Sequence, residues 1–296
     1  MTSITDNLFD QRTDRLANAR KSVRRFFRDP KAVIAVIILV VFVTVAVTAD
    51  LITPYGQTQQ SPRESLEFPS WDHLLGTDRL GRDLLDRIIY GTRVSVSVGL
   101  IAVGLAAGIG VPIGLLGGYF GGWMDEVLMR LVDAWIAFPQ LILLLAIVAI
   151  LGPGVVNVMV AIGLSSFPVY ARLVRGQTLW VKTTDYMLAA RALGATDLRM
   201  VLRHVLPNTI QPVIVQASLL VGAAVLAEAG LTFLGIGVNP PQATWGVIIQ
   251  EGFQVIRINP LPAILPGIGI ILFTLAANFL GDRMRDVLDP RLRGST

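Results

Sequence analysis

Long runs of apolar residues without a single charge interrupt this sequence at several places. The first, Ala32–Ala49, extends for 18 residues, which is long enough for an α-helix to cross the hydrocarbon core of a bilayer. Charged residues make up only 16% of the chain and hydrophobic residues 53%, whereas soluble domains are about 25% charged. The apolar excess is concentrated in discrete segments, so the sequence predicts an all-α integral membrane protein.

Six segments are expected to span the membrane. They cover about residues 32–49, 94–119, 134–151, 155–170, 209–234 and 261–280. In the second segment glycines recur at every fourth position, as Gly104/Gly108 and Gly110/Gly114/Gly118. Small residues at this spacing let two helices pack backbone to backbone.

The distribution of basic residues predicts the orientation. Of the 25 lysines and arginines, 19 fall on one side of a six-span arrangement, and such residues favour the cytoplasmic side. Both termini and the loop at residues 171–207 are therefore expected in the cytoplasm. A nucleic-acid-binding arm is not expected, because topology alone explains the basic N-terminus. A cleaved signal is disfavoured because its leader would be too long.

These signals divide the chain into consecutive parts. We expect a basic cytoplasmic tail at 1–31, a first transmembrane helix at 32–53, an external connection with a short amphipathic helix at 54–93, a transmembrane domain at 94–281 that contains the 171–207 loop, and a cytoplasmic tail at 282–296.

The residues that usually carry chemistry are scarce. There is no cysteine, and His73 and His204 lie far apart, so neither thiol chemistry nor an imidazole metal site is expected. No lysine follows a glycine as a phosphate-binding loop requires. We therefore expect no cofactor in this chain and no enzymatic activity of its own. Glu228 lies deep in a predicted span, where a carboxylate either serves function or fixes packing.

A cytoplasmic helical hairpin is predicted between the fourth and fifth spans. Thr183, Thr184 or Asp185 would begin its first helix, and Gly194 would end it in the left-handed conformation. The second helix would begin at Thr196 or Asp197, and its apolar face would consist of Leu198, Val201, Leu202 and Val205. The hairpin is either a docking element for another protein or an interfacial helix on anionic lipid.

The same hairpin resembles the coupling loop of permease subunits of bacterial ABC importers. Ala189-Ala190, Gly194 and Leu206-Pro207 match that pattern, whereas Leu188 stands where the family has glutamate. Further motifs resemble the dipeptide, oligopeptide and nickel branch, in particular its C-type permease. They are Leu75–Asp83, Tyr90–Ser95, Gly117–Gly122, Ala137–Pro139 and Glu228–Gly235.

This resemblance implies the fold of a type I ABC importer permease in the bacterial cytoplasmic membrane. It implies half of a translocation pathway for dipeptides or oligopeptides, beside a second homologous permease. Two ATPase subunits, which bind ATP and Mg, and an extracytoplasmic substrate-binding protein would complete the importer. The alternatives are an ATP-independent secondary transporter or channel, or a membrane-anchored sensor.

The resemblance also implies a set of site residues. The ATPase-coupling element would comprise Asp185, Ala189, Ala190, Arg191, Gly194, Ala195 and Asp197, and Glu228 is a candidate for the translocation path.

Overall fold

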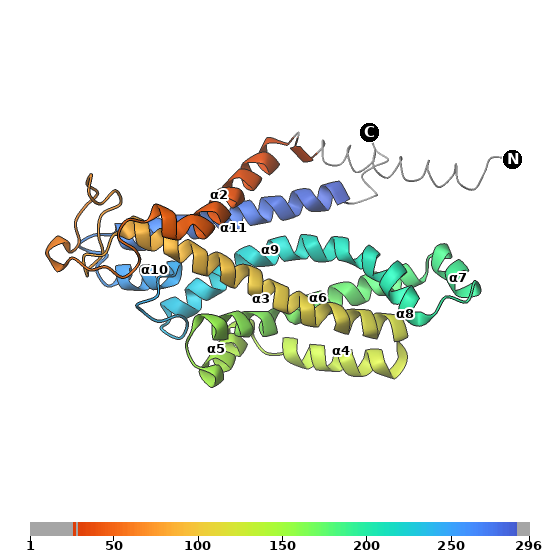
Figure 1. The fold of residues 1–296 in the computed structure, drawn as a ribbon. Helices are drawn as coiled ribbons and strands as arrows, with labels where there is room; N and C mark the ends of the chain where they lie inside the picture. Colours follow the sequence, from red (N-terminus) through yellow and green to blue (C-terminus); the bar gives the residue numbers. More distant parts are fainter. Residues whose placement is uncertain (1–25, 28, 289–296) are drawn as a thin grey trace.

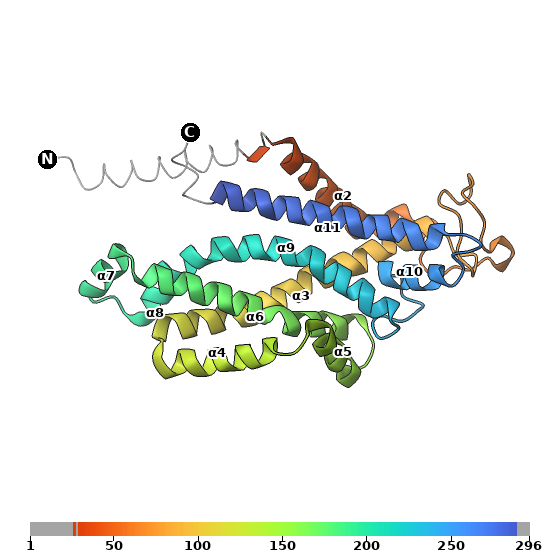
Figure 2. The ribbon, with the colours of Figure 1, turned by 180° about the vertical axis from the view of Figure 1, so that it is seen from behind.

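The computed structural model describes residues 26–27 and 29–288, and this part of the chain is largely helical. The predicted tails therefore lie mostly outside the described residues. The helices form one elongated bundle (Figures 1 and 2). In chain order the elements are α2 (Pro30–Ile52), the 3-10 turn η1 (Pro62–Glu64), α3 (Leu84–Phe120), α4 (Gly122–Ile136), α5 (Gln140–Leu151), α6 (Val155–Lys182), α7 (Asp185–Ala192), α8 (Asp197–Met200), the π-helical turn η2 (Val201–Val205), α9 (Leu206–Phe233), α10 (Trp245–Phe253) and α11 (Leu261–Leu288).

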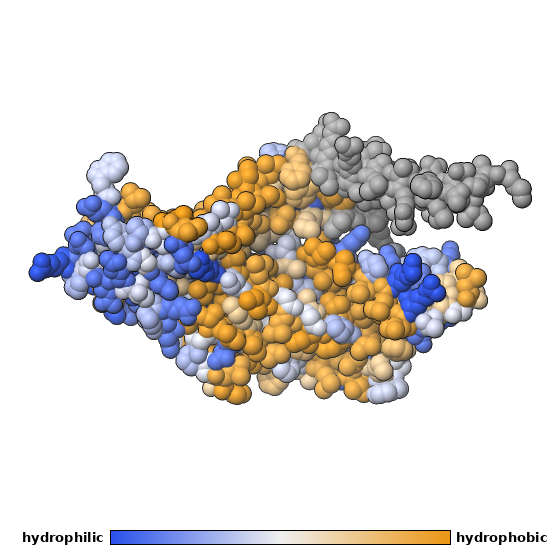
Figure 3. All heavy atoms as spheres, in the orientation of Figure 1, coloured by the Kyte–Doolittle hydropathy of each residue, from blue (hydrophilic) through white to orange (hydrophobic). Residues whose placement is uncertain are grey.

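Several helices of the bundle are long and apolar enough to span a membrane. By length and composition, five are able to cross a membrane, namely α2, α3, α6, the unit from α8 to α9, and α11. A sixth span results if the bent pair of α4 and α5 counts as one. Apolar residues cover much of the middle of the molecule and hydrophilic residues gather toward its two ends (Figure 3). The predicted all-α membrane fold is thus confirmed.

The predicted third span is not one straight helix. It was expected over residues 134–151, but α4 ends at Ile136, α5 begins at Gln140, and the two are bent by 90°. Pro139 stands immediately before α5. Proline has no N–H for a helical hydrogen bond and disfavours the helical conformation of the residue before it, which explains a break at this position.

The two sets of glycines in α3 lie in different surroundings. A side chain at Gly110, Gly114 or Gly118 would collide with α6, for example with the backbone oxygen of Ala171 at Gly114. At Gly104 and Gly108 a methyl group would meet no described atom within 4 Å. The prediction of close helix packing is therefore correct for the second set of glycines, which joins α3 to α6, whereas no described helix packs closely on the first set.

An additional helix, α10, lies between the predicted fifth and sixth spans. The side chain of Thr244 caps it by accepting a hydrogen bond from the Val247 backbone N–H at 3.1 Å. Trp245 is fully buried and packs edge-to-face on Phe42 of α2 and Phe273 of α11. The apolar indole thus anchors α10 to two spans.

The described part of the chain enters and leaves the bundle at the same end. The start of α2 and the end of α11 lie toward the end that carries α7, whereas α10 lies at the other end (Figures 1 and 2). An ion pair joins these two helices, with Arg283 Nε 3.3 Å from Asp29 Oδ2. The first described helix therefore starts, and the last one ends, on the side of the α7 hairpin, which is the predicted cytoplasmic side.

Candidate functional site

The hairpin at residues 185–200 begins where the fourth span ends. The hydroxyls of Thr183 and Thr184 donate to the carbonyls of Trp180 and Val181, at 2.8 and 2.6 Å. Thr184 stands at the N-cap position of α7 but its side chain makes no capping hydrogen bond there. The same two carbonyls also accept the backbone N–H groups of Thr183 and Thr184, both at 3.1 Å. The threonine hydroxyls therefore reinforce the end of α6, and α7 starts at Asp185 without a side-chain cap.

Gly194 makes the turn of the hairpin as predicted. Its φ is +77°, a left-handed conformation that costs glycine little. The Ala195 N–H donates to the Ala190 carbonyl at 3.1 Å, which satisfies a carbonyl at the end of α7 in the manner of a glycine cap. A side chain at Gly194 would meet no described atom within 4 Å. The turn is thus open on its outer side.

The hairpin is buried on one side and presents exposed leucines on the other. Met187 and Met200 are buried in the core of the bundle. Leu188, Leu193 and Leu198 point outward, with 59%, 88% and 70% of their surfaces exposed. The exposed side also presents Asp185, Ala189 and Arg191, whereas Ala190 and Ala195 are half-buried.

The predicted apolar face of the second hairpin helix is wrong in detail. The helix is one turn, α8, followed by the π-helical turn η2. Leu198 and Leu202 are exposed, whereas Met200 and Val205 are buried. The π-helical turn changes the helical phase, so residues chosen for a regular period of 3.6 do not share one face.

Two arginines of the 171–207 loop pair with acids of α4. Arg175 forms two hydrogen bonds of 2.6 Å with the carboxylate of Asp125 on α4, and Arg172 Nη2 lies 2.6 Å from Asp133 Oδ1. These pairs hold α4 against α6. Within the described residues, the arginines Arg191, Arg199 and Arg203 form no ion pair, so their charges are available on the hairpin and its continuation.

Glu228 occupies a buried polar network rather than an exposed surface. Its side chain is fully buried and accepts hydrogen bonds from the hydroxyls of Ser95 on α3 and Thr232 on α9, both at 3.1 Å. Protein encloses the carboxyl group in this conformation. A contribution of Glu228 to the translocation path stays a prediction, and its observed contacts join α3 to α9.

A second charged cluster, at the opposite end of the bundle, was not predicted. The guanidinium of Arg87 lies 2.6 Å from carboxylate oxygens of both Asp78 and Glu251. Arg82 bonds the same two acids, at 2.6 and 2.7 Å. All four residues are buried. The sequence signal was the charge-rich run from Asp78 to Arg87, but its partner Glu251 is too distant in sequence to be recognised.

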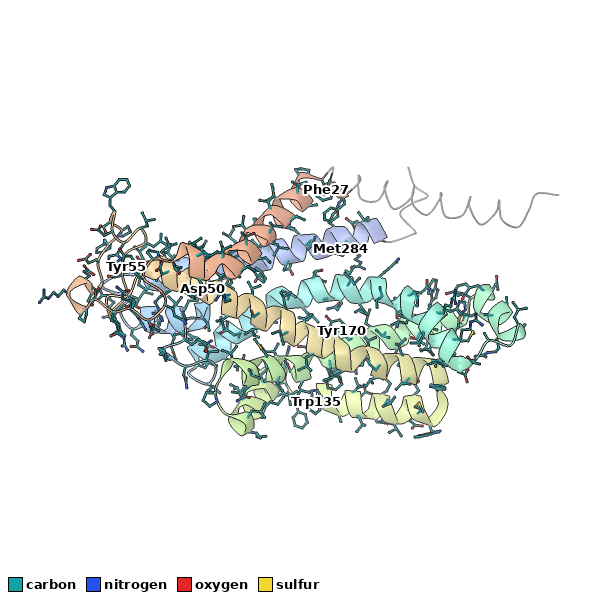
Figure 4. The ribbon with its side chains drawn as sticks, viewed as in Figure 1. Phe27, Asp50, Tyr55, Trp135, Tyr170 and Met284 are labelled. Carbon is teal, nitrogen blue, oxygen red and sulfur yellow. The ribbon has the colours of Figure 1, made fainter. Side chains whose placement is uncertain are left out.

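Polar contacts outside this cluster join α2 to α3. Asp50, near the end of α2 that faces the connection (Figure 4), pairs with Arg93 of α3 at 2.9 Å. The Tyr90 hydroxyl donates to the same carboxylate at 3.1 Å. In the described part of the chain no group of three or more His, Cys, Asp or Glu residues is arranged to hold a metal ion.

Comparison with known proteins identifies the family. Residues 110–294 match the family described as the binding-protein-dependent transport system inner membrane component. The chain belongs to this family of permeases. Residues 19–69 of the permease also match the N-terminal transmembrane domain of oligopeptide transport permease C.

Individual relatives support the same assignment. The glutathione transport system permease protein GsiD of Pectobacterium atrosepticum is 41% identical over 275 residues, which cover 93% of the permease and 91% of GsiD. The dipeptide transport system permease protein DppC of Alkalihalophilus pseudofirmus is 38% identical over 274 residues, which cover 93% of the permease and 90% of DppC.

A solved structure shares the fold. A chain of the MetNI methionine ABC transporter, in an inward-facing conformation, aligns with a TM-score of 0.56 and 21% identity. The alignment covers 69% of the permease and 97% of that chain.

These findings confirm the resemblance seen in the sequence. The protein is a multi-pass inner-membrane permease subunit of an ATP-driven ABC importer, and it works with ATPase and substrate-binding components. ATP hydrolysis belongs to the partner subunits, so the permease is not itself an enzyme. The relatives favour this function over an ATP-independent transporter or channel.

Proposed function

We propose that the permease forms half of a translocation pathway for dipeptides or oligopeptides. A second, homologous permease would supply the other half, and two ATPase subunits would dock on the cytoplasmic end and bind ATP and Mg. The names of the relatives, which are glutathione and dipeptide permeases, support a peptide substrate.

The ATPase-coupling element in this proposal is the hairpin of Asp185, Ala189, Ala190, Arg191, Gly194, Ala195 and Asp197. Its open turn at Gly194 is the observation that carries the proposal. A partner protein is able to approach the backbone closely there, while exposed leucines offer apolar contact area and Arg191 offers a charge-assisted hydrogen bond.

The alternative occupant of the hairpin surface is anionic lipid. Lipid would accept leucines and arginines, but it would gain nothing from a turn free of side chains. A protein partner gains close backbone contact from the same turn, so the open glycine favours protein docking.

A matched pair of glycine variants tests the docking site. Gly194→Leu should leave the permease in the membrane but abolish co-purification of the ATPase subunits and ATP-dependent peptide uptake. Gly152→Leu is the control, because Gly152 also has a positive φ of +84° and open surroundings but lies in the turn between α5 and α6. Normal ATPase co-purification with Gly194→Leu would refute the coupling assignment.

The substrate is tested separately with the assembled importer in proteoliposomes. Labelled dipeptide should accumulate with ATP and the binding protein, and unlabelled peptides should compete. Accumulation of a nickel chelate or an oligosaccharide without competition by peptides would overturn the peptide assignment.

A further inference from the structure

The cytoplasmic end of α3 is bonded directly to the hairpin. Tyr119, the last residue but one of α3, is buried. Its hydroxyl donates a hydrogen bond of 2.6 Å to Oδ1 of Asp197, the first residue of α8. In the described part of the chain, this is the side-chain hydrogen bond that joins the hairpin to α3.

Lys182 holds the tyrosine in place from a third element. It is the last residue of α6, and its ammonium group donates to the carbonyls of Gly118 and Tyr119, at 3.3 and 2.5 Å. These carbonyls lie at the C-terminus of α3, where no helical N–H reaches them and where positive charge is favourable. The same ammonium lies 5.6 Å from the centroid of the Tyr119 ring, which adds a cation–π contact.

Both helices of the hairpin meet at this tyrosine. Asp197 of α8 accepts its hydrogen bond, and Arg191 of α7 lies close to the same hydroxyl. Tyr119 also belongs to one buried cluster with Met187 and Met200. The end of α3 therefore shares the buried core with the hairpin and is joined to it by a directed hydrogen bond.

The other end of α3 belongs to the opposite side of the membrane. Near its start Arg87 pairs with Glu251 of α10, and farther along Ser95 bonds Glu228 of α9. Between these contacts and Tyr119, the glycine face of α3 packs tightly on α6. A displacement of the hairpin that reaches Tyr119 thus acts on a continuous helix whose far end holds α10.

We propose that Tyr119 is a positioning residue that transmits movement of the hairpin to α3 through its hydrogen bond with Asp197. This inference rests on the proposed function, because it takes the hairpin to be the ATPase-coupling element. An intact bond makes the hairpin and α3 move together, whereas its loss leaves the ATPases docked but lets the hairpin move without α3.

The test removes the hydroxyl and compares transport with ATP use. In proteoliposomes that contain the full importer and its binding protein, Tyr119→Phe should retain the ATPase subunits and hydrolyse ATP. Peptide uptake per ATP hydrolysed should fall by about tenfold, as expected from the loss of one charge-assisted hydrogen bond. A purely structural role would lower the amount of assembled importer without changing this ratio.

Tyr170→Phe is the matched control. Tyr170 lies on α6 inside the bundle (Figure 4), it is fully buried, and its hydroxyl has no hydrogen-bond partner among the described residues. Removal of this hydroxyl should leave uptake per ATP unchanged. An equal loss in both variants would overturn the role of Tyr119.

Asp197 provides an independent test of the same bond. Asp197→Asn keeps an oxygen that accepts the tyrosine hydrogen bond and should retain most coupling. Asp197→Ala should lower uptake per ATP hydrolysed by at least as much as Tyr119→Phe, because Asp197 also belongs to the coupling element. The double variant Tyr119→Phe/Asp197→Ala should be no worse than Asp197→Ala alone, because both substitutions remove the same hydrogen bond. Multiplied losses in the double variant, or unchanged uptake per ATP in Tyr119→Phe, would refute the inference.

These outcomes are separable from a failure of the proposed function. If Gly194→Leu keeps its ATPases, the coupling assignment itself is wrong. If Gly194→Leu loses them and Tyr119→Phe transports with normal uptake per ATP, the hairpin is the docking site and only the role of Tyr119 is wrong.

Discussion

His73 is held between two carboxylates in the connection that follows α2. Its side chain is 7% exposed, its Nδ1 lies 2.8 Å from Asp83 Oδ2, and its Nε2 lies 3.5 Å from Glu64 Oε2. Burial lowers the pKa of His73, but the hydrogen bonds and charges of Asp83 and Glu64 together raise the pKa by more, so that it lies above its ordinary value. The folded connection therefore favours the protonated imidazolium.

This pKa predicts a connection that loosens as the pH rises. The stabilisation is complete below about pH 6.5, the ordinary value for histidine, and it is lost as the pH rises through the higher pKa of the folded state. Limited proteolysis of residues 54–83 should therefore be faster at pH 8 than at pH 6.

His73→Gln is the matched variant for this prediction, because glutamine is polar but does not titrate in this range. The difference in proteolysis between the two pH values should shrink in the variant, after correction for protease activity on a free peptide. An unchanged difference would show that another group controls the connection.

At the scale of elements, the contact of α3 with α6 depends on the absence of side chains. Gly114→Ala would push a methyl group into the backbone of Ala171 and Arg175, which neither helix is able to avoid without moving. Overpacking of this kind costs about 1–3 kcal/mol. The purified permease complex should therefore unfold at a lower temperature.

Gly108→Ala on the same helix is the control for this prediction. The new methyl group would meet no described atom within 4 Å, and alanine is the better helix former by about 1 kcal/mol. Thermal unfolding of this variant should match or exceed that of the wild type. Equal destabilisation by both alanines would refute the assigned packing faces.

At the scale of the whole molecule, one buried ion cluster connects three parts of the chain. Asp78 and Arg82 belong to the connection after α2, Arg87 to α3, and Glu251 to α10. Two nitrogen atoms of Arg87, Nε and Nη2, already lack a hydrogen-bond partner among the described residues. The cluster therefore depends strongly on each carboxylate that remains.

Removal of the Glu251 charge should release this end of the bundle. Glu251→Ala leaves buried guanidinium groups with one acid fewer, and breaking a buried pair in this way costs about 3–5 kcal/mol. Proteolysis of the connection should accelerate and thermal stability should fall. Asp72→Ala, a loss of the same charge at an exposed position, should have little effect, and a similar loss in both variants would contradict the prediction.

Features that depend on local chemistry were predictable from the sequence alone. Apolar runs such as Ala32–Ala49 require a lipid environment wherever they lie in the fold. Gly194 favours a left-handed turn because of its own missing side chain, and Pro139 disfavours a continuous helix. The family assignment followed from short motifs that contain such residues.

Contacts between residues that are distant in the sequence became visible only in the folded bundle. Arg87 and Glu251 are separated by 164 positions, Ser95 and Glu228 by 133, and Tyr119 and Asp197 by 78. Neither partner of such a pair carries a local signal of the other. The same limit explains why only one of two glycine sets packs on α6, why α10 was missed, and why the π-helical turn altered the face of α8. Each of these features depends on the helix that packs opposite the segment or on a shift in helical phase. Neither can be predicted from the periodicity of one segment.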